Sequence, residues 1–438
     1  MVKVDKINFK LWLALILSSL IPLIYTTTRI HFIGSMPSSW SFSIAAQVAW
    51  LNIGYEVMSE ALLLPLAFIL GQVIKDSKAF QQRATASLGV IVLTYAVVTS
   101  LVFAFTPQLV SVMQQQESLL AQTIEYIRLE SIAIFVSSAY LFFNLVLLLH
   151  NKQKALYCLL VVQTVMTVLC DTLLVSQMPV SLQLGVTGIA ITNIMVNSLL
   201  VIASYKLLSL NDIDLDPRAI VFEGKPWLKE WFKIGSRSGL ESLVRNTAFV
   251  VMILQLMNQL QHAGVFWVAN SFIWGWLLLP VLTLGQLVKQ DAATNNGLSS
   301  QKVNRYLTVT CGIFVLWLMS APQWENFIHH VMGVTNAVEV TNIVYLLVGF
   351  YIVFALNNVI DSYFYGIGRT DLMLYQSLIV NTLFYGSAFV CYQLSWFVPT
   401  LDRVALMFGL GITADAIITW GLYIMIRKQQ FSQELVIA

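Results

Sequence analysis

The chain has 438 residues and a formal net charge of +2, with 58% hydrophobic and only 11% charged residues. Soluble proteins carry about a quarter charged residues, so this composition excludes a soluble domain and indicates a polytopic membrane protein. The small net charge implies no nucleic-acid surface. The sequence contains no HExxH, GxSxG or phosphate-loop motif, which argues against an enzyme.

Twelve segments are long and apolar enough to cross a bilayer, for which about 20 residues are needed. They are residues 9–30, 42–72, 86–106, 123–149, 155–176, 184–206, 233–257, 265–288, 303–321, 339–365, 372–395 and 404–426. The second exceeds the required length, so we expect it to be tilted, broken at Pro65 or partly outside the bilayer. The predicted fold class is all-α, with twelve transmembrane helices.

Lysine and arginine alternate from loop to loop along the chain. One set of loops carries basic residues throughout, for example Lys75, Lys152, Lys289 and Arg427, whereas the other set carries only Arg403. Basic loops are retained on the cytoplasmic side, so both termini are expected in the cytoplasm.

An internal repeat divides the chain. Leu62-Leu63-Leu64-Pro65 with the following Gly71-Gln72 recurs as Leu277-Leu278-Leu279-Pro280 with Gly285-Gln286, at an offset of about 215 residues. Duplicated halves are usual in transporters, with the substrate path between them. We predict a six-helix N-terminal lobe (1–210), a cytoplasmic linker (211–232) and a six-helix C-terminal lobe (233–438), related by a pseudo-two-fold axis along the membrane normal.

Charges inside the spanning segments are candidate functional residues, because each costs about 2.5–3.5 kcal/mol to insert. Asp171 has no basic residue in its own segment and needs a partner from another helix, for which Arg29 is the first-half candidate. An inert buried ion pair is the alternative interpretation. Snorkelling is the expected explanation for four charges nearer segment ends: Glu125, Arg128, Glu130 and Arg237.

Further polar groups lie in both predicted lobes. Glu56 and Glu60 are four residues apart and share a helix face, so they should titrate as a coupled pair. A proton site and two solvated residues at a cavity mouth remain equal alternatives for them. In the second lobe, Glu241 and Arg245 are spaced for a local ion pair, and Asn357, Asn358 and Asp361 suggest a polar cavity.

Several short motifs resemble those of the MATE (multidrug and toxic compound extrusion) transporters, within the multidrug/oligosaccharidyl-lipid/polysaccharide flippase superfamily. The residues that carry the resemblance are Gly71-Gln72, Gly285-Gln286, and the stretches 185–192, 235–240 and 366–370. The resemblance covers nearly the whole chain. It implies export of amphipathic, often cationic compounds in exchange for sodium ions or protons.

The resemblance also implies a coupling site in the first lobe. Asp171 is similar to the acidic residue of the fifth segment in one bacterial branch, Thr167 stands where that branch usually has Asn, and Thr192 supplies a hydroxyl. Arg29 departs from the pattern, because the family typically has Asp there. Arg245 stands about where another branch has Glu. One hypothesis is that protonation of Asp171, or of the Glu56 and Glu60 pair, releases Arg29 and repacks this lobe.

The expected function is therefore cation-coupled export of a small organic compound by alternating access, with the choice of proton or sodium open. A lipid-linked glycan flippase and a MATE-like exporter with altered coupling are the alternatives. We expect no enzyme activity and no resident cofactor or metal. The expected partners are a small-molecule substrate and the lipid bilayer, with a monomeric chain in a bacterial inner membrane.

Overall fold

The computed structural model describes residues 7–36, 40–150, 152–213, 215, 226–294 and 297–437, and within these it is helical with no strand. Eleven helices there are long and apolar enough to cross a membrane. A twelfth span is formed by Ala263–Leu277 and Leu279–Ala292, which bend by 53° at the break between them. The predicted all-α fold with twelve spans is confirmed.

Contacts divide the chain into two compact units, Met1–Leu23 with Val251–Ala438 (unit 1) and Ile24–Val250 (unit 2). Helix α1 (Phe9–Gly34) runs from unit 1 into unit 2. Unit 2 also holds α2 (Ser41–Ala45), α3 (Val48–Gly71), α4 (Ser77–Val112), η1 (Glu117–Leu119), α5 (Leu120–Leu149), α6 (Gln153–Leu174), α7 (Gly185–Ser209) and α8 (Pro226–Phe249).

Unit 1 contains the remaining elements, among which η3, η4 and η6 are π-helical turns. They are η3 (Val250–Leu254), α9 (Gln255–Gln259), α10 (Ala263–Phe272), η4 (Ile273–Leu277), α11 (Leu279–Thr294), α12 (Ser300–Ser320), η5 (Ala321–Gln323), α13 (Trp324–His330), α14 (Ala337–Gly366), α15 (Thr370–Ile379), η6 (Val380–Tyr385), α16 (Gly386–Gln393) and α17 (Leu401–Ile437).

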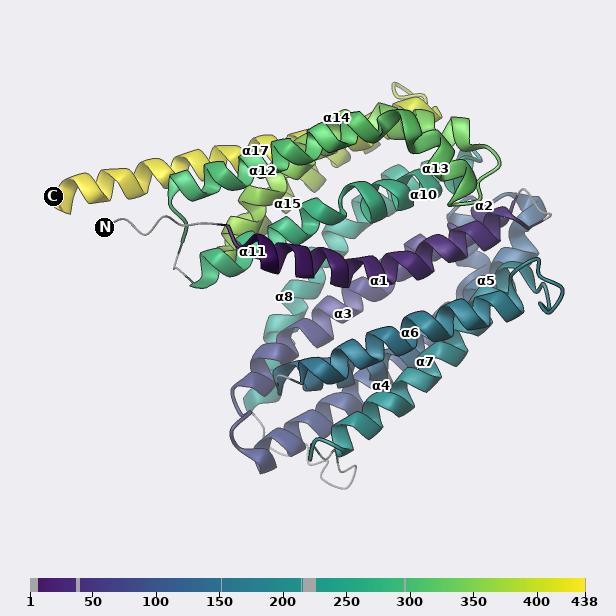
Figure 1. Cartoon of the computed structure of the whole chain (residues 1–438), viewed down its shortest axis with the longest axis horizontal. Helices are drawn as coiled ribbons and strands as arrows, with labels where there is room; N and C mark the ends of the chain where they lie inside the picture. The colour runs from purple at the N-terminus through teal and green to yellow at the C-terminus, as the bar shows by residue number, and fades with distance from the viewer. Residues whose placement is uncertain are drawn as a thin grey trace. The chain divides into compact units, whose positions relative to one another are not determined.

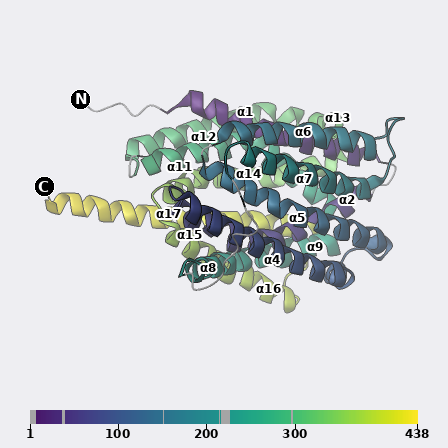
Figure 2. The same cartoon turned by 90° about the horizontal axis from the view of Figure 1, so that it is seen from below.

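Helix α5 is the centre of unit 2 and packs against α3, α4, α6 and α7. Figure 2 shows it between α4 and α7. Its side chains Phe142, Val146 and Leu147 are fully buried, and the first two lie one helical turn apart on one face. In a bilayer this packing is not driven by exclusion of water, because lipid is as apolar as the side chains, so shape complementarity has to hold the helices together.

Two glycines allow α8 to approach α3 closely. A Cβ at Gly235 would overlap the Ala61 carbonyl oxygen, and a Cβ at Gly239 would lie 2.7 Å from the Ala61 side chain. Glycines four residues apart form the small-xxx-small pattern of close helix pairs. The Trp231 indole adds a hydrogen bond of 2.9 Å to the Leu62 carbonyl oxygen.

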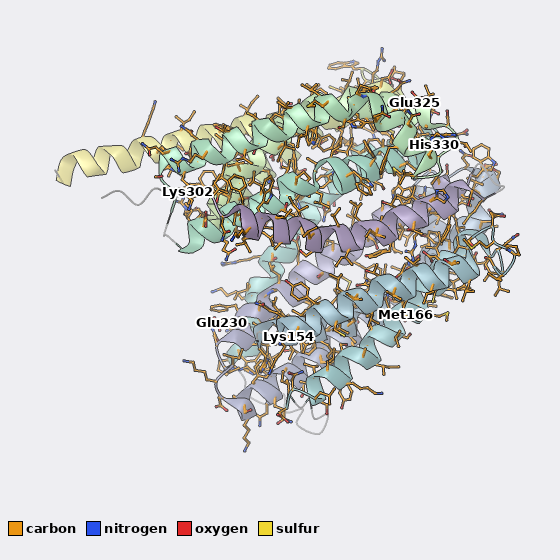
Figure 3. All side chains as sticks on the ribbon, in the orientation of Figure 1. Lys154, Met166, Glu230, Lys302, Glu325 and His330 are labelled. Atoms are coloured by element: carbon orange, nitrogen blue, oxygen red, sulfur yellow. The ribbon has the colours of Figure 1, made fainter. Side chains whose placement is uncertain are left out.

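Helix α14 is the centre of unit 1, where α10, α11, α12, α13 and α17 pack against it (Figure 1). Its side chains Tyr351 and Phe364 are fully buried. Figure 3 shows Lys302 at one end of unit 1 and Glu325 and His330 at the other.

The first part of α1 belongs to unit 1. The Trp12 indole donates to the Pro280 carbonyl oxygen at 3.1 Å and to the Thr283 hydroxyl at 3.2 Å. Further along the helix, Leu23 fills the space that a Cβ at Gly275 would occupy. The first part of α1 thus packs against η4 and α11, which contain the second copy of the repeat.

The two units have different limits from the predicted lobes. Residues before Ile24 lie with the second half of the sequence, and α8 lies with the first half, because of the Trp12 and Trp231 contacts above. Within the predicted linker 211–232, residues 214 and 216–225 lie outside the described residues.

The long second segment is broken, although not at Pro65. Its break lies at Ala46 and Gln47, between α2 and α3, while Pro65 lies within α3. In the second repeat the helix does break beside the proline, at Leu278, one residue before α11 begins. The two copies of Leu-Leu-Leu-Pro therefore have different backbone conformations. Whether a proline kinks or ends a helix depends on the residues that pack around it.

Candidate functional site

A buried ion pair joins α1 and α6 in unit 2. The Arg29 Nε atom lies 2.8 Å from Asp171 Oδ2, and Nη2 lies 3.3 Å from Oδ1. Two parallel bonds of this kind fix the guanidinium plane and are among the stronger protein hydrogen bonds. Only 1% of the Asp171 side chain and 17% of the Arg29 side chain are exposed. The structure shows the interhelical pairing that the sequence predicted.

The position of Asp171 explains why it needs a cation. It lies in the last turn of α6, which ends at Leu174. The negative end of a helix dipole disfavours a carboxylate there and favours a cation nearby. Arg29 supplies that cation and is itself in the penultimate turn of α1, which ends at Gly34. The pair therefore offsets an otherwise unfavourable buried charge.

A second carboxylate, Glu130 of α5, faces the same guanidinium. Its side chain is buried, with 3% exposed, and it interacts electrostatically with Arg29 and Asp171. Asn193 of α7 donates to Glu130 Oε1 at 2.7 Å, and the Tyr126 hydroxyl forms another hydrogen bond with this carboxylate. Arg29, Asp171, Glu130, Tyr126 and Asn193 are called the unit 2 cluster below.

The two threonines predicted for this site are both buried. Thr167 lies one turn before Asp171 on α6 and is 4% exposed. Thr192 precedes Asn193 on α7 and is fully buried, and its hydroxyl oxygen has no hydrogen-bond partner in the described part of the chain. Their placement on α6 and α7 agrees with the prediction, and their participation in ion binding stays a prediction.

Snorkelling was the wrong interpretation for Glu130, whereas Glu125 and Arg237 are exposed as expected. Glu130 faces inward because it shares one buried helix face with Thr123 and Tyr126, which precede it by seven and four residues. That recurrence of polar residues at helical spacing is the signal in the sequence that identifies it.

Three carboxylates surround Arg245 elsewhere in unit 2. Its guanidinium lies 2.7 Å from Glu60, 3.5 Å from Glu56 and 3.8 Å from Glu241. The shortest pair thus links α8 to α3, so the local pair with Glu241 is the weakest of the three. All four side chains are between one quarter and one half exposed. Partly exposed ion pairs of this kind contribute little to stability.

Unit 1 contains a third polar cluster, built on α14 and α17. The Asn357 amide donates to Asp361 Oδ2 at 3.0 Å and to Asp415 Oδ2 at 3.1 Å. Thr419 donates to Asp361, and Gln376 donates to Asp415. Among the described residues, no basic side chain forms an ion pair with either aspartate.

The predicted group on α14 is split by the structure. Asn357 and Asp361 belong to the cluster just described, called the unit 1 cluster below. The side-chain amide oxygen of Asn357 is buried without a hydrogen-bond partner in the described part of the chain. Asn358 points to α11 instead, where it donates to the Val281 carbonyl oxygen at 3.2 Å. Asp415 and Gln376 complete the cluster from α17 and α15, which spacing along one helix could not reveal.

No protein-family model matches the chain, and no curated protein matches it significantly in sequence. Solved structures do match. An inward-facing multidrug resistance MATE family transporter of the MOP superfamily aligns with a TM-score of 0.76 at 14% identity, over 98% of this chain and 99% of that one. The chain has the fold of MATE transporters.

Two further MATE-fold structures are similar. A MOP superfamily transporter from Pyrococcus furiosus, whose binding pocket of reversed polarity suggests a different function, has a TM-score of 0.66 at 16% identity, with 96% of this chain and 94% of that chain covered. The Vibrio cholerae MATE transporter VcmN has a TM-score of 0.64 at 14% identity, with 97% and 96% covered. The MATE fold thus accounts for nearly the whole chain.

Proposed function

We propose that this protein is a secondary transporter that exports small amphipathic or cationic organic compounds in exchange for a cation. The observation that carries the proposal is the MATE fold over 98% of the chain, shared with a structure described as a multidrug resistance transporter. The clusters around Asp171 and Asp361 support the proposal as well, because ionisable groups inside spanning helices are costly and mark ion or substrate pathways.

Either cluster offers a place for the exchanged cation. In unit 1, Asp361 and Asp415 share one amide donor, so a proton or sodium ion would relieve their mutual repulsion. In unit 2, the Arg29 guanidinium already neutralises the Asp171 carboxylate, as a bound cation would. A fixed guanidinium cannot leave as an exchanged ion, and this distinguishes the two clusters.

The basic loops support export from a cytoplasm that holds both termini. In unit 1, α17 ends at the side where α1 begins (Figure 1). We propose that this side is cytoplasmic, because it carries the lysine- and arginine-rich loops of the alternating pattern. We further propose that the chain functions as a monomer in a bacterial inner membrane and has no enzyme activity.

Dye uptake into proteoliposomes tests the function. With an acidic lumen, outward proton flow should drive ethidium inward, and a sodium-loaded lumen provides the parallel test for sodium. Uptake above that of protein-free liposomes under one of the gradients is expected. Equal uptake with and without protein, for ethidium and for a panel of other organic cations, would contradict the proposal.

A further inference from the structure

We propose that Glu130 is the proton-binding group of unit 2, and that Arg29 and Asp171 stay ionised while Glu130 alternates between carboxylate and carboxylic acid. This inference rests on the proposed function and names the group that carries the exchanged ion. It differs from protonation of Asp171, because the structure gives the two carboxylates unequal partners.

The unit 2 cluster contains more acidic than basic side chains. One guanidinium faces two buried carboxylates, so the fully ionised cluster carries one uncompensated negative charge. A buried charge without a partner is strongly disfavoured. Arginine cannot give up its proton in a protein, so neutrality is reached only by adding a cation to one carboxylate. The cluster is balanced when one of the two acids is protonated.

The geometry selects Glu130 as that acid. Both Asp171 oxygens accept from the guanidinium, at 2.8 and 3.3 Å. Protonation of Asp171 would weaken these bonds and leave Arg29 without its closest counter-ion, which is strongly unfavourable for a buried pair. Glu130 has no direct bond to Arg29 among the described contacts, so its protonation leaves the ion pair intact.

The neighbours of Glu130 accommodate both of its protonation states. Asn193 donates to one oxygen and can continue to do so when the other oxygen carries a proton. The Tyr126 hydroxyl donates to a carboxylate and can accept from a carboxylic acid, because a phenol has both capacities. Loading of Glu130 therefore requires a hydroxyl rotation and no rearrangement of helices.

The remaining surroundings favour a proton over sodium. The groups that interact with Glu130 are Arg29 of α1, Asp171 of α6, Asn193 of α7 and Tyr126 of α5 itself. Helices α3 and α4 also pack on α5 and contribute none of the groups that interact with Glu130 in the described part of the chain. A sodium ion would face the guanidinium and an amide NH2, whereas a proton needs no further ligands.

Infrared spectroscopy of the purified full-length protein tests the site directly. All proteins in this experiment, wild type included, also carry Asp361→Asn and Asp415→Asn, so that the two acids of unit 1 contribute no band. As pH falls, wild type on this background should gain the C=O band of a buried carboxylic acid. We expect Glu130→Gln to lose this band, and Glu125→Gln, an exposed acid on the same helix, to retain it. Glu130→Asp should retain a titrating band at a shifted frequency. Persistence of the wild-type band in Glu130→Gln or an unshifted band in Glu130→Asp would overturn the assignment.

Two further measurements distinguish a proton from sodium at this site, and the role of Glu130 from the proposed transport function. The band should titrate at the same pH in sodium and in choline buffer, and a shift of the midpoint by sodium would overturn the choice of a proton. In proteoliposomes, Glu130→Gln should lose proton-driven ethidium uptake and keep exchange of ethidium between equal concentrations. Full proton-driven uptake by Glu130→Gln would refute the inference while leaving the proposed function standing. Absence of uptake by wild type would instead remove the function, and the infrared titration would still decide the proton site.

Discussion

The Trp231 indole nitrogen donates a hydrogen bond of 2.9 Å to the carbonyl oxygen of Leu62, inside a helix pair that two glycines bring together. This contact joins the first helix of the second sequence half to the second helix of the first half. In unit 1, Trp12 makes a comparable bond to Pro280. Trp231 thus holds α8 in unit 2, and Trp12 holds the first part of α1 in unit 1. In both contacts an indole donates to a carbonyl oxygen of the repeated Leu-Leu-Leu-Pro stretch.

Replacement of Trp231 by Phe should destabilise unit 2 through the lost hydrogen bond. Such bonds contribute about 1 kcal/mol, with an average near 0.6 kcal/mol in one membrane protein. We expect a lower melting temperature in detergent for Trp231→Phe. The neighbouring Phe232 is 53% exposed, so Phe232→Leu is the matched control and should melt as wild type does. Equal melting of all three proteins would argue against the contact.

Enlargement of Gly239 should force α8 away from α3. A new Cβ there would lie 2.7 Å from that of Ala61, and overpacking of this kind costs about 1–3 kcal/mol. Gly54 lies on α3 with no atom within 4 Å of its added Cβ, so Gly54→Ala is the control. The expected result is a lower melting temperature for Gly239→Ala than for Gly54→Ala; the reverse order would contradict the close packing.

The Arg29–Asp171 pair should show strong coupling in a double-mutant cycle. Arg29→Met leaves Asp171 without its guanidinium partner near Glu130, which should cost about 3–5 kcal/mol. Addition of Asp171→Leu should recover much of that loss, because an apolar pair can replace a buried ion pair. Glu60→Gln removes a partly exposed partner of Arg245 and should cost less than about 1 kcal/mol. Additive effects of the two unit 2 cluster mutations would show that the residues act independently.

Cysteine labelling should place the two ends of unit 1 on opposite sides of the membrane. In a chain whose four native cysteines are replaced by serine, an impermeant maleimide added to intact cells should label Glu325→Cys and not Gln301→Cys. Both residues are exposed. Glu325 lies at one end of unit 1, and Gln301 directly precedes Lys302, which lies at the other end (Figure 3). Labelling of Gln301→Cys alone would invert the proposed orientation.

The spans and the Arg29 pairing were predictable because both follow from the cost of polarity in lipid. Twenty apolar residues predict a helix, and an isolated Asp171 demands a cation from elsewhere. The π-helical turns η3, η4 and η6 lie inside spanning segments, and the hydrophobic pattern gives no sign of them. The joining of Asp361 and Asp415 depends on tertiary packing of α14 and α17, which hydrophobic pattern does not determine.

The sequence predicts where a helix lies better than it predicts where the helix begins and ends. The apolar run at 86–106 correctly predicted the position of a spanning helix, but α4 is longer at both ends and extends from Ser77 to Val112. Asp76 caps its start by accepting from the Ala79 backbone nitrogen at 3.1 Å. Hydropathy measures the part of a helix within lipid, whereas capping residues determine where the helix begins.

Ethidium uptake into proteoliposomes under an imposed proton gradient is the most direct test of cation-coupled transport. With an acidic lumen, wild type should accumulate dye, Glu125→Gln should match it, and Glu130→Gln should fall to the rate seen without a gradient. Uptake by wild type that is unaffected by proton and sodium gradients alike would contradict coupled transport.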